Sequence, residues 1–206
     1  MTRRVRGATP AGGAASGRLV IVSGPSGAGK TSVLKQLYER CTLPLVPSVS
    51  ATTRSPRPGE RDGVDYHFLA PEEFHRRRER DDFLECVEVF RGGHWYGTPR
   101  SEVQRGLDGG NWVVLEIDVE GALQVMERFP DTISFFVRPP TTEELAHRLR
   151  GRNTEDDTTV RHRLAEANRE LAQAHHYDHE IVNDHVDRAA DRICHILTQL
   201  AENTPA

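Results

Sequence analysis

A glycine-rich loop near the start of the chain carries the clearest chemistry in the sequence. Residues 24–31 read Gly-Pro-Ser-Gly-Ala-Gly-Lys-Thr; they follow the apolar run 19–22 and precede a helix-like stretch that begins at Ser32. In this context the glycines let successive backbone N–H groups turn inward around a polyphosphate, and the helix N-terminus adds partial positive charge. Lys30 supplies a full charge, and the Thr31 hydroxyl can ligate Mg²⁺. The loop therefore predicts a nucleotide phosphate site, and a ligand-free strand-to-helix turn is the simpler alternative.

A pair of arginines offers a second place to hold a phosphate. Arg54 and Arg57 lie three residues apart with Pro56 between them, and Tyr66 follows in a short alternating segment. Two guanidinium groups can clamp a phosphate from two directions, and a phenolic hydroxyl can donate a third hydrogen bond. An arginine pair on a solvated face is the alternative.

The elements that must position these groups alternate between apolar runs and charged, helix-patterned segments. We expect buried strands at 19–23, 112–117 and 133–137, followed by helices at 31–40, 119–128 and 142–150. Such alternation predicts an α/β fold with a parallel sheet flanked by helices and with ligands at the carboxyl ends of the strands. The rhythm is broken by a mainly β insertion from about residue 48 and by a second insertion, rich in Arg and acidic residues, from about 151 to 174.

Composition sets limits on function. The formal net charge of −4 over 206 residues argues against a general nucleic-acid binder, and no apolar run approaches the ~18 residues of a membrane helix. The three cysteines, Cys41, Cys86 and Cys194, have no spacing typical of a zinc site or a disulfide framework, so we expect a cytoplasmic protein. Residues 1–17 contain almost no large apolar side chain and are expected to form a disordered tail.

The chain resembles guanylate kinases, and the resemblance runs from residue 18 to the C-terminal helix. Besides the phosphate loop, it rests on motifs at 48–60, 62–68, 83–85, 96–98, 116–121, 148–152 and 181–184. It implies a P-loop NTPase core (18–47, 99–150 and 175–203), a mainly β GMP-binding insertion at about 48–98 and a helical lid at about 151–174. It also implies an ATP:GMP phosphotransferase that uses Mg²⁺ with ATP, acts on GMP and also dGMP, and works as a monomer or homodimer.

The same resemblance implies roles for individual residues. ATP would be bound by Gly24, Pro25, Ser26, Gly27, Ala28, Gly29, Lys30, Thr31, Ser32 and Asn183, with Thr31 on the metal and Asn183 near the adenine. GMP would be bound by Ser50, Arg54, Arg57, Tyr66, Glu85, Tyr96, Gly97, Thr98 and Asp118. The catalytic charges would be Lys30, Arg54, Arg148, Arg152 and Arg163. Three positions depart from the family pattern: Ala51, Cys86 and Asn153.

The chemistry of guanine agrees with the carboxylate at position 85. Guanine presents two adjacent donors beside the O6 acceptor, so Glu85 suits the donors and a hydroxyl such as Thr98 or Ser50 suits O6. Without the family, Glu85 is an acidic residue in an alternating strand and is expected to be solvated. Asp118 follows the strand 112–117, where it can serve the nucleotides or cap the next helix.

Two other functions fit parts of the sequence. A related P-loop kinase acting on a ribose bisphosphate would keep the loop but would not need a guanine-reading Glu85 and Thr98. A non-catalytic protein-binding module of the same type would lose phosphate-loop residues, which this chain keeps. His175, His176 and His179 have a spacing that can ligate a metal, but without a neighbouring Cys or an H-E-x-x-H pattern we interpret them as surface and structural residues.

Overall fold

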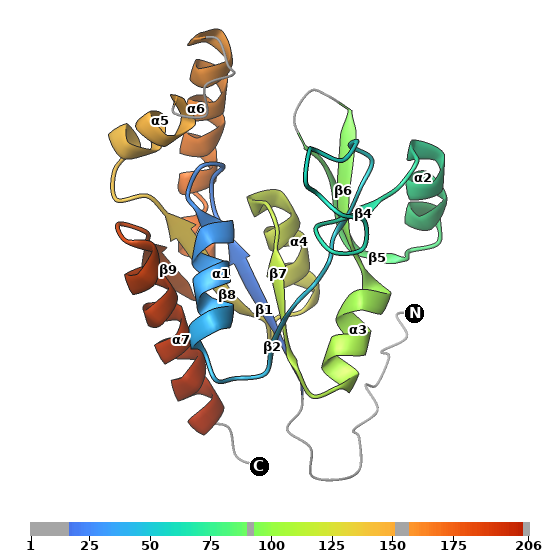
Figure 1. Ribbon diagram of the computed structural model, residues 1–206, viewed down its shortest axis with the longest axis horizontal. Coiled ribbons are helices and arrows are strands. Elements are labelled where there is room, and N and C mark those ends of the chain that lie inside the picture. Colours follow the sequence, from blue (N-terminus) through green and yellow to red (C-terminus); the bar gives the residue numbers. More distant parts are fainter. Residues whose placement is uncertain (1–16, 90–92, 151–156, 204–206) are drawn as a thin grey trace, which may run out of the picture.

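The central sheet consists of five parallel strands. The computed structural model describes residues 17–89, 93–150 and 157–203, and the sheet has the order β2-β7-β1-β8-β9 (Figure 1). The strands are β1 (Arg18–Ser23), β2 (Leu45–Pro47), β7 (Trp112–Glu116), β8 (Ile133–Arg138) and β9 (His179–Val182). Strand β1 lies in the middle, with β7 on one side and β8 on the other. Because all five strands are parallel, their carboxyl ends meet at one edge, where ligands of such sheets collect.

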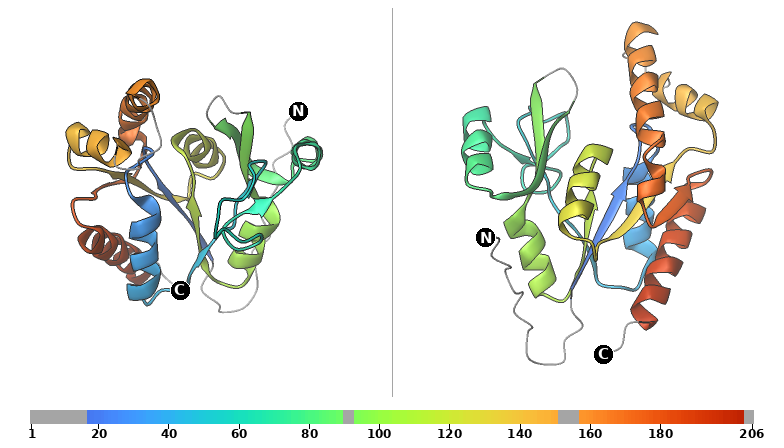
Figure 2. Two further views of the ribbon diagram at one scale, coloured as in Figure 1. Left: turned by 45° about the horizontal axis from the view of Figure 1, so that its top comes forward. Right: turned by 180° about the vertical axis from the view of Figure 1, so that it is seen from behind.

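Helices cover both faces of this sheet. Helices α1 (Lys30–Arg40) and α7 (Val186–Glu202) pack together on one face, as Figures 1 and 2 show. Helices α3 (Arg100–Asp108) and α4 (Val119–Arg128) lie on the other face. The strands alternate between the two cores: Val20 and Val22 belong to the first and Ile21 to the second. Both faces are therefore apolar, which explains why the strands read as unbroken hydrophobic runs.

A second, smaller sheet stands beside the first. Its order is β4-β3-β6-β5, built from β3 (Ala51–Thr52), β4 (His67–Phe68), β5 (Phe83–Val89) and β6 (His94–Pro99). Helix α2 (Pro71–Glu79) closes it through Phe74, which stacks on Phe83 with ring centroids 4.5 Å apart. The longest strand pair of this sheet is β5 with β6. The two strands are antiparallel, and their register shifts between Phe83 and Cys86.

The remaining helices rise from the carboxyl edge of the central sheet. Helix α5 (Thr142–Arg150) and helix α6 (Asp157–Leu171) share a small core of Leu145, Leu149 and Ala167. A short 3₁₀ turn, η1 (Ala174–His176), returns the chain to β9. In Figure 1 the α5–α6 pair and the second sheet stand on opposite sides of the molecule, with the loop after β1 between them.

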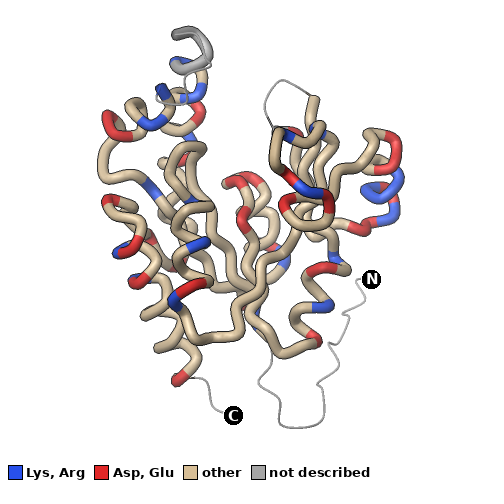
Figure 3. Tube along the Cα trace, viewed as in Figure 1, with Lys and Arg blue, Asp and Glu red and all other residues tan. Residues whose placement is uncertain are grey.

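Acidic and basic residues are interspersed along the described chain. In Figure 3 the blue and red segments alternate, and α2 changes from acidic in its first turn to basic in its last. In the described part of the chain, no helix combines the length and the apolarity needed to cross a membrane.

The parallel sheet and the three expected strand–helix pairs are confirmed, with ends that shift by one residue. The sequence pattern did not predict α2, α3 or the short strands β2 and β9. Their patterns are weak: α2 buries a single side chain, Phe74, and α3 buries only Val103. The described residues leave out nearly all of the expected tail 1–17 and the first part of the expected lid, including Arg152 and Asn153.

Candidate active site

The phosphate loop takes a conformation that requires its glycines. Gly24, Gly27 and Gly29 have φ values of 135°, 88° and 88°, which side-chain-bearing residues rarely adopt. A Cβ at Gly24 would lie 2.0 Å from the carbonyl oxygen of Val137 in the neighbouring strand. The loop thus combines left-handed backbone with close contact to β8, and it ends at the N-terminus of α1, where N–H groups attract anions.

Lys30 and Thr31 begin helix α1. The Lys30 Nζ donates to the carbonyl oxygens of Gly24 (2.7 Å) and Pro25 (3.3 Å), so its ammonium lies over the loop. The Thr31 hydroxyl donates to Glu116 Oε1 at 2.6 Å. Glu116 is in reach because the β1–β7 register pairs it with Val22, at the end of β1. A hydroxyl and a carboxylate oxygen therefore lie together beside the loop, which is the ligand chemistry that Mg²⁺ prefers.

Two of the expected catalytic arginines contact the phosphate loop. The Arg148 guanidinium donates to Ala28 O at 3.4 Å and to Asn183 O at 3.1 Å, and Arg163 Nη2 donates to Ser26 Oγ at 3.0 Å. Both side chains come from the α5–α6 pair, so these helices bring positive charge to the loop. Arg152, another of the four expected catalytic arginines, lies outside the described residues.

Asn183 lies under the same loop. It is buried at 2% exposure, and its amide nitrogen donates to Ala28 O at 2.7 Å. A Cβ at Gly29 would lie only 2.5 Å from that nitrogen, so the glycine is what lets Asn183 approach. The observed contact of Asn183 is thus with the loop backbone. Ser32, also expected on the ATP side, lies exposed in the first turn of α1.

On the second sheet, Arg54 is held in place by several partners. Its guanidinium makes a two-pronged ion pair with Glu60, at 2.8 and 3.0 Å, and its Nε donates to the Tyr96 hydroxyl at 3.2 Å. The Tyr66 ring lies under it, 5.4 Å from the guanidinium carbon. Arg57, by contrast, is exposed, and its backbone N–H donates to Glu60 Oε2 at 2.7 Å. Arg57 therefore lies on a solvated face, as the alternative interpretation of the arginine pair expected, whereas Arg54 does not.

Glu85 is buried, at 4% exposure, so the expectation of a solvated side chain is wrong. Strand β5 places it against the N-terminal turn of α4, where a Cβ at Gly121 would lie 2.7 Å from Glu85 Oε2. The Thr98 hydroxyl donates to Glu85 Oε1 at 2.7 Å. Burial raises the pKa of Glu85 to about 7, and the Thr98 hydrogen bond opposes that rise. In this arrangement the hydroxyl expected to meet guanine O6 is directed at the carboxylate instead.

Asp118 caps helix α4. One of its carboxylate oxygens accepts from the Gly121 N–H at 2.7 Å, so the capping alternative is observed. Burial raises its pKa, and the nearby Lys30 ammonium lowers it. Asp118 also acts on Glu85, whose pKa it raises. A Cβ at Gly121 would lie 3.4 Å from Asp118 Oδ1 and 2.7 Å from Glu85 Oε2, so the two carboxylates lie together at the start of α4.

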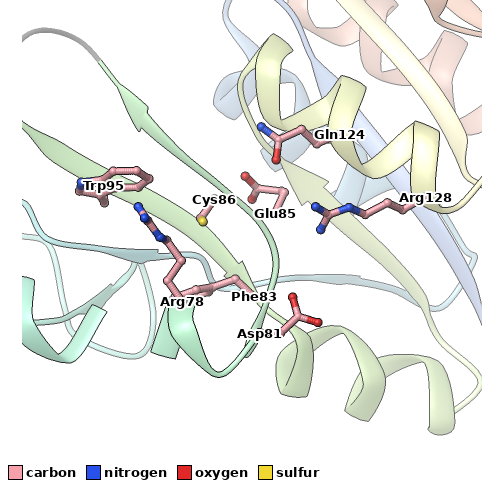
Figure 4. Close-up of a pocket in the computed structure, with 8 residues that line it drawn as sticks. All are labelled: Arg78, Asp81, Phe83, Glu85, Cys86, Trp95, Gln124 and Arg128. Atoms are coloured by element: carbon pink, nitrogen blue, oxygen red, sulfur yellow. The ribbon is translucent and has the colours of Figure 1, made fainter. Parts of the chain in front are cut away.

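A pocket of about 350 Å³ opens beside Glu85. Figure 4 shows Glu85 between β5 and α4, with Cys86, Trp95 and Arg78 on one side and Gln124 and Arg128 on the other. Cys86 lines this pocket, and its pKa is raised by burial. The Glu85 carboxylate thus accepts the Thr98 hydrogen bond and also lines the pocket.

The other expected GMP residues support this arrangement. Ser50 accepts a backbone hydrogen bond from His67 at 2.8 Å, which ties it to β4. Gly97 is buried in β6, where a Cβ would lie 3.0 Å from both the Cys86 Cβ and the Glu85 carbonyl oxygen. The glycine therefore permits the close β5–β6 pairing that presents Glu85.

Two carboxylates that were not among the expected site residues contact residues that were. Glu60 belongs to the arginine motif, and its position six residues after Arg54 was a usable signal. Glu116 lies at a strand end, but nothing in the sequence connects it to Thr31, which lies on another element. Contacts between distant segments of the chain become visible only when the fold is known.

Comparison with known proteins agrees with this geometry. The sequence profile of the family described as guanylate kinase matches residues 16–200. The chain is 52% identical over 190 residues to a guanylate kinase of Rhodopirellula baltica, covering 92% of this chain and 91% of that protein. It is 47% identical over 198 residues to one of Gloeobacter violaceus, covering 96% and 95%. The crystal structure of guanylate kinase from Anaplasma phagocytophilum superposes with a TM-score of 0.75 at 35% identity, covering 93% of this chain and 89% of that one. The chain, with its phosphate loop, paired arginines and buried glutamate, therefore belongs to the guanylate kinase family, the ATP:GMP phosphotransferases.

Proposed function

We propose that the two halves of the site bind the two nucleotides of this reaction, ATP on the phosphate loop and GMP against the second sheet. The observation that carries the proposal is the meeting of two carboxylates at the start of α4, where a Cβ at Gly121 would lie 2.7 Å from Glu85 Oε2 and 3.4 Å from Asp118 Oδ1. Residues from the two sheets thus converge at the N-terminus of α4. A phosphoryl group held there would lie between both sets of charges.

On the ATP side, the backbone of residues 24–31 would hold the phosphates and Lys30 would neutralise their charge. Thr31 and Glu116 fit a Mg²⁺ site, with Thr31 as ligand and Glu116 orienting the coordinated water; when bound, the cation would neutralise the β- and γ-phosphate oxygens. Arg148, Arg152 and Arg163 would stabilise charge that spreads over the transferred group.

On the GMP side, Arg54 would bind the phosphate together with Arg57, Tyr66 and Tyr96. Glu60 would hold the Arg54 guanidinium in its binding orientation. Glu85 would accept the two guanine donors, while Ser50, Thr98 and Asp118 surround the base. None of these groups addresses the ribose 2′-hydroxyl in the proposed arrangement, so dGMP should also be a substrate.

The chemical step would be an in-line transfer. A phosphate oxygen of GMP attacks the γ-phosphorus of ATP while the bond from that phosphorus to the β–γ bridging oxygen breaks, giving GDP and ADP. No side-chain nucleophile or general base is required, because the attacking oxygen is already charged. Catalysis would come from positioning and charge stabilisation.

The direct experiment is a coupled ADP-release assay with GMP, dGMP, IMP, AMP, CMP and UMP. GMP should give the highest kcat/KM, with dGMP next. Equal turnover of AMP and GMP would contradict the proposed role of Glu85, because adenine presents an acceptor where guanine presents a donor.

We also propose that the segments around both nucleotides, about 48–98 and 151–174, close on the core when substrates bind. Arginines on either side would be drawn toward the same phosphates. Small-angle scattering should show a smaller radius of gyration with a bisubstrate analogue, and identical profiles would contradict closure.

The three free thiols agree with the cytoplasmic location that we propose.

A further inference from the structure

Strand β5 contains a β-bulge at the point where it presents Glu85. Its antiparallel register with β6 shifts between Phe83 and Cys86. Across this shift, Leu84 and Glu85 stand opposite a single residue of β6, Thr98. Bulges of this kind bend a strand and re-aim a side chain, and they are common beside active sites. The extra residue thus helps to direct Glu85 toward the Thr98 hydroxyl, which donates to its carboxylate at 2.7 Å.

Helix α4 holds this bulge through Leu84. The Leu84 side chain is 4% exposed and belongs to the same core as Val119 and Ala122 of α4. Its carbonyl oxygen accepts a hydrogen bond from Arg128 Nη1 at 3.0 Å. A bulge disrupts the ladder locally, and a backbone carbonyl that leaves the ladder needs another donor. Arg128, in the last turn of α4, supplies that donor from outside the sheet.

The side of α4 that carries Arg128 also meets Glu85. Gly121, Gln124 and Arg128 follow one another at spacings of three and four residues, so they lie on one side of the helix. A Cβ at Gly121 would lie 2.7 Å from Glu85 Oε2. Gln124 and Arg128 line the pocket beside that carboxylate, and Figure 4 shows the Arg128 side chain extended from α4 toward β5. Burial raises the pKa of Glu85, and the Arg128 guanidinium opposes that rise.

We propose that Arg128 is a positioning residue for guanine recognition, which fixes the bulge at Leu84 and thereby aims the Glu85 carboxylate at the base. This inference rests on the proposed role of Glu85. Arg128 lies two turns from the Asp118 end of α4, where the two nucleotides are proposed to meet, so it acts through β5 and not on a nucleotide. Without the Arg128 hydrogen bond, the bulge is held only by the packing of Leu84, and the direction of the neighbouring carboxylate is less well fixed.

The test compares Arg128→Met, which loses the donor and the charge, with Arg128→Lys, which keeps the charge and a donor. In Arg128→Met, KM for GMP should rise about tenfold with kcat and KM for ATP within twofold, because only the base is held less well. IMP lacks the 2-amino group and should lose less than GMP. Arg128→Lys should stay within threefold of the parent. Arg192→Met, the same change at an exposed position of α7, is the matched control and should keep the parent kinetics.

A double-mutant cycle shows whether Arg128 acts through Glu85. In a Glu85→Gln background, Arg128→Met should raise KM for GMP less than twofold further, since the carboxylate that it positions is gone. A full tenfold rise in that background would overturn the inference, because Arg128 would then affect GMP by another route. An equal proportional loss with GMP, IMP and AMP, accompanied by a lowered Tm, would overturn it too, because the effect would then be a general one on the fold.

The single variant Glu85→Gln distinguishes this inference from the proposed function. If Glu85→Gln affects the bases unequally but Arg128→Met keeps the parent KM for GMP, only the role of Arg128 fails. If Glu85→Gln lowers activity with GMP, IMP and AMP in equal proportion, the proposed role of Glu85 fails and the inference fails with it. Measuring ADP release with the parent enzyme and GMP checks the reaction independently of both variants.

Discussion

The two halves of the proposed active site are built in different ways. The proposed ATP half relies on main chain: Lys30, Asn183 and Arg148 all donate to backbone carbonyl oxygens of the contiguous loop 24–31. The proposed GMP half relies on side chains from separate strands and loops. Arg54 forms an ion pair with Glu60, and Glu85 accepts a hydrogen bond from Thr98.

This difference has a consequence for specificity and for tolerance to mutation. Backbone N–H groups at a helix N-terminus bind any polyphosphate, so in the proposed arrangement the ATP half would supply affinity and charge stabilisation. In the proposed GMP half, the buried Glu85 carboxylate would select the base, because it rejects a partner that offers an acceptor. We therefore expect mutations in the ATP half to affect kcat for every substrate, and mutations in the GMP half to affect substrates unequally.

The largest expected effect tests the ATP half. Lys30→Met should leave the fold intact and lower kcat by about 10³-fold with every nucleotide acceptor, because a preorganised charge on the phosphates is lost. Steady-state kinetics of ADP release would measure it. Lys35→Met, on the exposed side of the same helix, is the control. Turnover near the parent rate in folded Lys30→Met would mean that the loop does not bind the phosphates.

The second prediction tests the GMP half. Glu85→Gln keeps the volume but loses the charge that would accept two guanine donors, which should cost about 3 kcal/mol, or roughly a hundredfold, in kcat/KM for GMP. IMP lacks the 2-amino group and should lose less. Kinetics with GMP, dGMP, IMP and AMP would decide this, with Glu88→Gln on the exposed side of β5 as control. Equal proportional losses on all four substrates would show that the base is read elsewhere.

A smaller effect is expected from the partner of Arg54. Glu60→Gln removes the two-pronged ion pair but leaves the arginine and its contacts with Tyr96 and Tyr66 in place. KM for GMP should rise about three- to tenfold, with kcat and KM for ATP within twofold, since a charged hydrogen bond that orients Arg54 is weakened. Glu72→Gln on α2 is an exposed control. An effect on KM for ATP as large as that on KM for GMP would break the separation of the two halves.

The smallest expected effect concerns stability against pH. Burial raises the pKa of Glu85 from 4.5 to about 7, so between these values the unfolded chain releases a proton that the folded protein keeps. The contribution of Glu85 to stability therefore falls as pH rises through this window and is constant above it. Without nucleotide, Glu85→Gln should melt a few degrees above the parent at pH 8, and the two Tm values should converge toward pH 5. A gap that does not change with pH would mean that Glu85 titrates as an exposed group.

Local pattern alone was enough for the phosphate loop and for the three central strand–helix pairs that carry it. The phosphate loop is contiguous, and each of its glycines meets a backbone requirement that can be read within eight residues. Strands β1, β7 and β8 are apolar on both faces, so their runs and the helices after them were predicted to within a residue. Helices α2 and α3 were missed because one buried side chain in each is too weak a periodic signal.

Tertiary structure decided the environment of the side chains. The pattern of β5 is that of a solvated face at Glu85, and only the packing of β5 against the start of α4 buries it. Asp118 was left between two roles until the Gly121 N–H contact showed that it caps α4. The contacts of Thr31 with Glu116 and of Ser26 with Arg163 join residues 85 and 137 positions apart. Burial and long-range hydrogen bonds depend on how elements pack, and a sequence pattern reports only which residues are close along the chain.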